Sequence, residues 1–241
     1  MTTEHSRNKI GIADKLLSWF QKNRRDFPWR RTFENPDPYV ILFTEIMLQR
    51  TKANQVAPLY LEFFRKYPTF AKLKQAARDE VIELFARLGL QWRARRVWDL
   101  VTFLDQEHQG KIPRELKELE KLPGVGTYVA RAVSCYAFGD GTAPVDSNVV
   151  RVISRVFGIV ISSDTGRRSK KISGVTTSLI PIGKERDFNL ALLDFAALVC
   201  KPRPLCAVCP LQDSCKYYES RANVSRIPLK SENLKQNPRL L

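Results

Sequence analysis

The sequence predicts an all-α protein. Apolar residues recur at three- and four-residue spacing along most of the chain, as Ile10, Ala13, Leu17 and Phe20 do near its start. No stretch of convincing length alternates apolar and polar residues as a half-buried strand does. No internal repeat of fixed period is present.

The predicted helices follow one another along the whole chain. After the first helix, Asp37-Pro38 combines a good N-cap with a first-turn proline, and it opens a helix over about 39–51 that is apolar on nearly every side. Further helical patterns cover about 53–66, 77–88, 94–109, 114–121, 148–157 and 187–199, and another begins after Gly126. The polar, basic stretch 162–173 is predicted to be a loop, and the polar, basic tail 220–241 has no clear apolar face and is expected to be mobile.

Composition and charge indicate a soluble intracellular protein with a nucleic-acid partner. Of the 241 residues, 44% are hydrophobic, which is enough for one large core or two modest ones. No apolar run is long enough for a membrane span, and the N-terminus does not resemble a secretory signal. The formal net charge of +15, with a pI near 9.8, favours a polyanionic partner. A solubility charge or a basic tail is the alternative. Against a tail alone, basic residues recur along the chain: Arg24, Arg25, Arg30, Arg31, Arg93, Arg95, Arg96, Arg167, Arg168, Lys170 and Lys171.

A glycine-rich turn lies between two predicted helices, at Leu122-Pro123-Gly124-Val125-Gly126. Two glycines one residue apart permit a tight turn with close backbone approach. The helix that follows presents free N–H groups at its positive end. This combination favours binding of a phosphate without reading base sequence. An ordinary corner between two helices is the alternative.

Four of the five cysteines are crowded together, as Cys200-x5-Cys206-x2-Cys209-x5-Cys215, whereas Cys135 stands apart. In a reducing compartment such crowding favours a metal centre over disulfides. Four thiolates suit an iron–sulfur cluster or a zinc ion, and the spacing alone does not separate the two.

Two carboxylates stand at informative positions. Asp146 directly precedes an apolar-periodic helix, and local sequence favours a helix N-cap for it or for Ser147. Glu45 lies in an apolar stripe of its helix, where an ionised carboxylate is costly unless it is paired. Glu45 is therefore either a cleft residue with a raised pKa, suited to proton transfer, or the partner of an arginine such as Arg50.

The hairpin, an aspartate about twenty residues later, and the clustered cysteines together resemble the helix–hairpin–helix DNA glycosylases of the endonuclease III and MutY superfamily, over about residues 15–218. The resemblance implies two helical domains that flank a DNA-binding cleft. It assigns 1–35 and 141–219 to an iron–sulfur cluster domain, 36–140 to a six-helix domain with the hairpin, and 220–241 to a basic tail. It also implies a [4Fe–4S] cluster on Cys200, Cys206, Cys209 and Cys215, although the family usually has six residues, not five, between the first two ligands.

The same resemblance implies roles for individual residues. Asp146, in Val-Asp-Ser-Asn, matches the catalytic aspartate of the family. Glu45, in Thr-Glu-Ile-Met-Leu-Gln-Arg-Thr, matches a glutamate that the adenine-removing branch uses as a general acid. The matching hairpin residues, expected to contact DNA, are Leu122, Gly124, Val125 and Gly126. Gln49 and Arg50 are also expected to contact DNA, with Arg50 reaching into the gap that a flipped base leaves.

Tyr128 indicates the branch of the family. The bifunctional endonuclease III branch has a lysine at this position, whose amine forms a Schiff base that leads to strand cleavage. A tyrosine forms no Schiff base, so the chain resembles a monofunctional enzyme, with Tyr128 lining the base pocket. The adenine-removing branch typically has serine there, and the thymine–guanine mismatch glycosylases of the Mig type have tyrosine. Local stretches are also similar to the Mig type: 24–30, 37–42 and 186–190.

The resemblance therefore implies a base excision repair enzyme that removes thymine, and uracil, mispaired with guanine. We expect a monomer that acts on duplex DNA in the cytoplasm, at the nucleoid. One alternative is an adenine glycosylase acting opposite guanine or 8-oxoguanine, which Glu45 favours. Against it, the 8-oxoguanine-reading domain of that branch is not expected here. The other alternative is a non-catalytic iron–sulfur protein that binds DNA, in which Asp146 only caps a helix.

Overall fold

The computed structural model describes residues 2–33, 35–89, 91–161 and 169–225. Within these ranges the chain is helical and contains no strand, which confirms the all-α prediction. The α-helices are α1 (Thr2–Asn23), α2 (Pro38–Leu48), α3 (Ala53–Lys66), α4 (Phe70–Leu73), α5 (Arg78–Ala86), α6 (Gln91–His108), α7 (Leu116–Lys121), α8 (Thr127–Phe138), α9 (Ser147–Phe157), α10 (Lys170–Ser178), α11 (Glu185–Leu198) and α12 (Lys216–Ser225). Short 3-10 helices are η1 (Pro28–Phe33), η3 (Cys206–Val208) and η4 (Gln212–Ser214).

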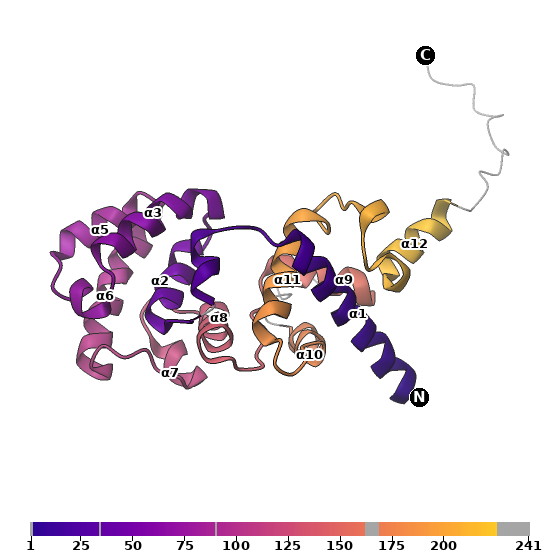
Figure 1. The fold of residues 1–241 in the computed structure, drawn as a ribbon, viewed down its shortest axis with the longest axis horizontal. Coiled ribbons are helices and arrows are strands. Elements are labelled where there is room, and N and C mark those ends of the chain that lie inside the picture. Colours follow the sequence, from indigo (N-terminus) through magenta and orange to yellow (C-terminus); the bar gives the residue numbers. More distant parts are fainter. Residues whose placement is uncertain (1, 34, 90, 162–168, 226–241) are drawn as a thin grey trace, which may run out of the picture.

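The helices form two groups (Figure 1). Helices α2 to α8 lie together in one group, and α9 to α12 lie in the other. The first helix, α1, belongs with the second group, because it packs against α11. Helix α11 in turn packs against α9, and it also contacts α8 of the first group. The N-terminal segment of the chain therefore completes the C-terminal group of helices.

Helix α2 is the central helix of the first group. The Asp37 side chain accepts a hydrogen bond from the Tyr39 backbone N–H at 2.8 Å, and Pro38 occupies the first turn, as predicted. Nearly every residue of α2 is buried, and the helix packs against α3, α8 and η1. A helix that is apolar on all sides is stable only inside a core, so α2 carries Glu45 into the interior between the two groups.

Two predictions about irregular segments were partly wrong. Residues 170–173 of the expected loop begin α10, where the Ser169 hydroxyl accepts from the Ile172 N–H, and 162–168 lie outside the described residues. In the expected tail, 220–225 belong to α12, and 226–241 again lie outside. Helix α12 has little apolar periodicity of its own and is positioned by packing against α9. A Cβ on Gly158 at the end of α9 would lie 3.3 Å from the Lys216 Cβ.

Within the part of the chain that the structure describes, none of the helices has the length and apolar character that a membrane crossing needs.

Candidate active site

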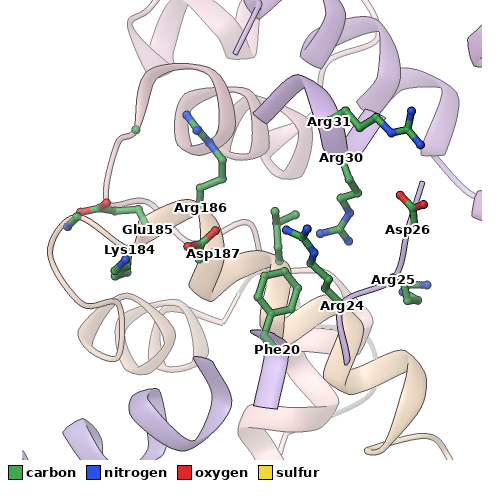
Figure 2. A pocket seen from close by; sticks show the side chains of 13 residues that line it. Phe20, Arg24, Arg25, Asp26, Arg30, Arg31, Lys184, Glu185, Arg186 and Asp187 are labelled. Carbon is green, nitrogen blue, oxygen red and sulfur yellow. The ribbon is translucent and has the colours of Figure 1, made fainter. Parts of the chain in front are cut away.

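A cleft of about 660 Å³ lies between the two helix groups. Its walls come from the C-terminal end of α2, the N-terminal ends of α8 and α9, and parts of η1 and α11. The predicted site residues that line it are Glu45, Gln49, Arg50, Gly126, Tyr128 and Asp146. A larger cavity, of about 850 Å³, contains none of the predicted site residues (Figure 2). The smaller cleft is therefore the candidate active site.

Asp146 caps α9 and also lines the cleft. One carboxylate oxygen, Oδ1, accepts from the backbone N–H groups of Asn148 and Val149 at 2.9 and 2.8 Å. The other, Oδ2, accepts from the Asn148 side-chain amide at 2.6 Å. The cap expected from local sequence is thus present. The same hydrogen bonds hold the carboxyl group in one orientation at the cleft wall.

Glu45 is buried at the floor of the cleft, with 7% of its surface exposed. Its Oε2 atom is buried and has no hydrogen-bond partner among the described residues. Burial raises the pKa of Glu45 from its ordinary 4.5 to about 7; Arg30 opposes the rise and the charge of Asp146 adds to it. Among the described residues, Glu45 forms no ion pair with Arg50, which was the alternative expectation. At neutral pH this carboxyl is therefore divided between its protonated and ionised forms.

Tyr128 lies on the first turn of α8, close to both carboxylates. Burial raises its pKa well above the ordinary value, and the negative charges of Glu45 and Asp146 add to the rise. The phenol therefore stays protonated at any physiological pH and is able to donate a hydrogen bond.

The hairpin adopts the tight turn that its glycines predict. Gly124 has a left-handed φ of 80°, and the Val125 N–H bonds the Leu122 carbonyl at 3.0 Å. The side chains of Leu122 and Val125 are buried in the core. Any contact of these two residues with a phosphate must therefore come from the backbone.

Gln49 and Arg50 lie in the turn after α2, which ends three residues earlier than predicted. The Gln49 side-chain amide donates to the Gly124 carbonyl at 3.0 Å, so it fastens the hairpin to this turn. Arg50 is exposed at the cleft wall and has a positive φ of 53°, which is unusual for a residue with a side chain.

Arg93 explains both the early end of α2 and the strained turn. Its buried guanidinium donates to the carbonyl oxygens of Met47 and Gln49 and to the Thr51 hydroxyl. These bonds take the place of the next helical turn. The expectation that Arg93 contributes to a DNA-attracting surface was wrong, because only 1% of this residue is exposed.

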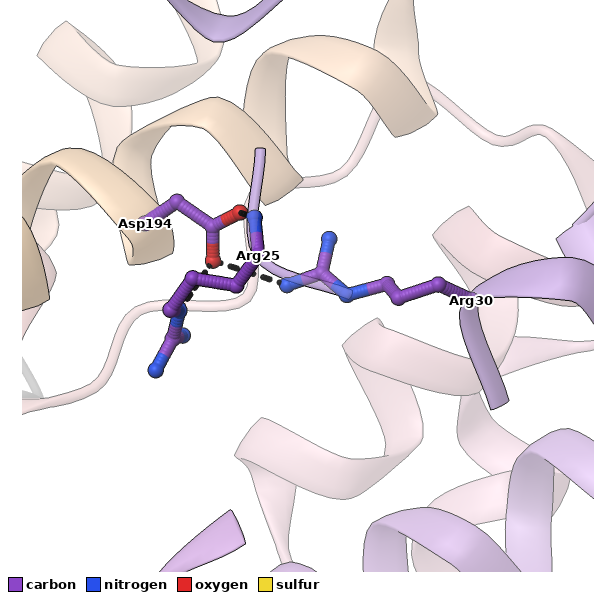
Figure 3. Close-up of polar contacts among 3 residues, drawn as sticks. All are labelled: Arg25, Arg30 and Asp194. Carbon is purple, nitrogen blue, oxygen red and sulfur yellow. Dashed lines mark hydrogen bonds and ion pairs between the residues drawn. The ribbon is translucent and has the colours of Figure 1, made fainter. Parts of the chain in front are cut away.

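Arg25, Arg30 and Asp194 form a partly buried ionic group that no sequence pattern predicted (Figure 3). The Asp194 side chain is fully buried. It accepts from the Arg25 backbone N–H at 2.9 Å, from Arg25 Nε at 2.7 Å and from Arg30 Nη2 at 2.9 Å. Both arginines line the cleft, and Arg30 supplies the positive charge that acts on Glu45. One sequence signal was available: Asp194 lies within an apolar stretch of α11, as Glu45 does in α2, and a carboxylate in such a stretch needs a partner.

The four clustered cysteines line one small cavity beside the end of α11, together with residues of η3, α9 and α12. All four are free thiols. Arg155 of α9 closes this cavity: its guanidinium lies 3.6 Å from Cys200 Sγ, and its carbonyl oxygen accepts from Cys215 Sγ at 3.6 Å. Among the described residues, no three cysteine, histidine or carboxylate side chains converge on a single metal ion.

Known proteins are similar to this chain in both sequence and fold. Residues 43–175 match the HhH-GPD superfamily of base excision DNA repair proteins. The thymine/uracil-DNA glycosylase of Methanothermobacter thermautotrophicus is 42% identical over 217 residues, which cover 89% of this chain and 96% of that protein. The adenine DNA glycosylase of Homo sapiens is 37% identical over 208 residues, which cover 83% of this chain but only 38% of that protein.

Among solved structures, that of a thermostable thymine-DNA glycosylase superposes with a TM-score of 0.80 at 39% sequence identity, over 89% of this chain and 98% of that one. The matched residues 43–175 include the C-terminal half of α2 with Glu45, the hairpin and Asp146. The chain belongs to the HhH-GPD superfamily of base excision DNA repair proteins.

Proposed function

We propose that this protein is a monofunctional DNA glycosylase that removes thymine or uracil mispaired with guanine and leaves an abasic site. The observation that carries the proposal is the cleft that joins Asp146, Glu45 and Tyr128. The thymine/uracil specificity follows the more similar relative, whose length the chain also matches. Tyr128, in the place of a Schiff-base lysine, accounts for the absence of strand cleavage.

DNA binding in this proposal begins with the phosphates. The backbone of the hairpin and the basic surface hold the duplex without reading its sequence, so binding weakens steeply as salt increases. The mispaired base then rotates out of the stack into the cleft. A mispaired thymine costs less to extrude than a paired one, which contributes to selectivity. Arg50, held outward in its strained turn, enters the space that the base leaves.

Hydrolysis then breaks the bond between the base and the sugar C1′ atom. Positive charge develops on the sugar, and the Asp146 carboxylate, fixed by its cap hydrogen bonds, stabilises it. A water oxygen bonds to C1′ and passes a proton to Asp146. The leaving base carries negative charge, and protonated Glu45 donates a proton or a hydrogen bond to it. A pKa near 7 suits Glu45 to that step at neutral pH.

We infer that the two helix groups are the two predicted domains, 36–140 on one side and 1–35 with 141–219 on the other. The cysteine cavity supports a [4Fe–4S] cluster held by Cys200, Cys206, Cys209 and Cys215. Four thiolates that line one cavity suit either an iron–sulfur cluster or zinc, and the resemblance to the endonuclease III superfamily favours the cluster. When bound, the cluster would fix the segment between α11 and α12.

The substrate is tested by base excision from labelled duplexes that carry T·G, U·G, A·G, A·8-oxoguanine or matched pairs, each read with and without alkali. We expect cleavage only after alkali, at T·G and U·G. Cleavage at the adenine pairs would move the protein to the adenine branch, and cleavage without alkali would contradict the monofunctional mechanism.

The role of Asp146 is tested by Asp146→Asn, which keeps an N-cap but removes the negative charge. We expect excision to fall by at least about 100-fold while binding of the T·G duplex is retained. Asp99→Asn, at an exposed position on α6 outside the cleft, is the matched control and should keep wild-type activity. Full activity of Asp146→Asn would leave the aspartate as a cap alone and favour a different mechanism.

A further inference from the structure

The larger cavity lies behind Arg25 and Arg30, between the end of α1, η1 and the N-terminal end of α11 (Figure 2). Six basic side chains line it against three acidic ones. Phe20 and Leu190, both nearly buried, give it an apolar floor. Its volume of about 850 Å³ falls in the range of small-ligand sites. The cavity is therefore large enough, and basic enough, for a bound anion.

The position of this cavity separates it from the face that would hold duplex DNA. Gly126, at the N-terminal end of α8, lines the catalytic cleft, whereas Gly139, just after the C-terminal end, lines the second cavity. The twelve residues of α8 span about 18 Å. The two cavities share only Arg25, Arg30 and Leu190. The hairpin and the second cavity thus lie at opposite ends of α8, although this cavity adjoins the catalytic cleft at the shared residues.

Three of the six basic side chains that line this cavity are exposed. Arg24, Arg31 and Lys184 form no ion pair with any described residue. Figure 2 shows the guanidinium groups of Arg24 and Arg30 both pointing into the cavity near Phe20. Two like charges that point into one space repel each other unless an anion lies between them.

Arg30 is fixed at the wall of this cavity. Its Nη2 atom donates to Asp194 Oδ1 at 2.9 Å, which leaves the second Nη2 hydrogen unused by Asp194. The Nε and Nη1 atoms have no hydrogen-bond partner among the described residues, and they are closed off from the cavity. Arg30 therefore acts on the cavity through its positive charge and its Nη2 atom.

None of the three acidic residues of the cavity, Asp26 included, forms an ion pair with a described residue. The Glu185 carboxylate accepts from the Gly183 N–H at 2.9 Å and so is turned toward its own loop. Asp187 lies in the first turn of α11, where the helix dipole favours it. The uncompensated positive charge is therefore on the arginine side of the cavity.

We propose that this second cavity binds a phosphate group, held between Arg24 and Arg30 with Lys184 at its edge. Arginine matches phosphate with charge-assisted hydrogen bonds, and the guanidinium groups of Arg24 and Arg30 point into the same space. The phosphate comes from a small phosphorylated ligand rather than from the bound duplex, because the cavity lies away from the hairpin. This site is independent of the base that the cleft accepts.

The test is calorimetric titration of the full-length protein with tripolyphosphate at fixed ionic strength. We expect one bound equivalent for the wild type. The double variant Arg24→Ala/Lys184→Ala should weaken binding at least about tenfold, as the loss of charge-assisted hydrogen bonds predicts. The control Arg65→Ala/Lys72→Ala removes the same charge from exposed positions on α3 and α4 and should bind as the wild type does. Thermal unfolding of each variant checks that the fold is intact.

Equal affinity of the cavity variant and the wild type, or equal weakening in both double variants, would overturn the proposal. A second measurement identifies the source of the phosphate: the affinity of the wild type and of the cavity variant for a matched duplex is measured at increasing salt concentrations. If the cavity takes free phosphate, the cavity variant keeps the wild-type salt dependence. If it takes a DNA phosphate, the logarithmic salt slope of the variant falls by about one to two. T·G excision without tripolyphosphate should be unchanged in the first case.

Discussion

Glu45→Gln tests whether the cleft raises the pKa of this carboxyl. The substitution keeps the size and shape of the side chain and removes its titration. In the wild type the folded state binds the Glu45 proton more tightly than the unfolded chain does. The free energy of unfolding therefore falls as pH rises from the ordinary pKa of 4.5 to about 7, and above that it stays at the lower value.

The size of the effect follows from the two pKa values. Each pH unit between them corresponds to about 1.4 kcal/mol. Ionising Glu45 inside the fold then costs roughly 3 kcal/mol at pH 8 and less than about 1 kcal/mol at pH 5. The glutamine amide is also buried, but its cost does not change with pH. Between pH 5 and pH 8 the stability difference should thus move by about 2 to 3 kcal/mol in favour of the variant.

The assay is urea unfolding, followed by circular dichroism at intervals from pH 5 to pH 8. In thermal unfolding the same change corresponds to roughly 5 to 10 °C in Tm for a chain of this length. Glu83→Gln is the matched control, since Glu83 is exposed on α5 and lies outside the cleft. The reasoning is refuted if the difference between wild type and Glu45→Gln is the same at every pH.

Three further predictions concern the chemistry. The excision rate of the wild type should fall as pH rises through about 7, because protonated Glu45 is lost. Glu45→Gln should excise more slowly, and its rate should not decline over this pH range. If the rate of the variant declines as that of the wild type does, another group causes the decline. Tyr128→Lys should gain strand nicking without alkali, trappable with borohydride as a covalent adduct, and no adduct would show that the cleft does not bring an amine to the sugar. Cys209→Ser should lose bound iron and the brown visible absorption, whereas Cys135→Ala should keep both; a colourless wild type that binds zinc would reject the cluster.

The main helices were predictable because their signals are local. The cap and proline at Asp37-Pro38 open α2, and the hairpin glycines separate α7 from α8. Helices α10 and α12 were not predicted, because their apolar patterns are weak and their positions depend on packing against α9. The end of α2 was also misplaced, because the buried guanidinium of Arg93, more than forty positions later in the sequence, takes up its last carbonyl groups.

The sequence by itself determined which groups are capable of chemistry: the Asp146 cap, the hairpin, the cysteine spacing and a tyrosine in place of lysine at 128. Each of these depends on a few neighbouring residues, so each is readable along the chain. Only the tertiary structure decided that Glu45 lines the cleft and is not paired with Arg50. It also decided that the positive charge acting on Glu45 comes from Arg30. Arg30 and Asp194 are 164 positions apart. Burial and electrostatic fields come from residues that meet only after folding. For that reason no local pattern showed that Arg25 and Arg30 line both the cleft and the basic cavity behind it.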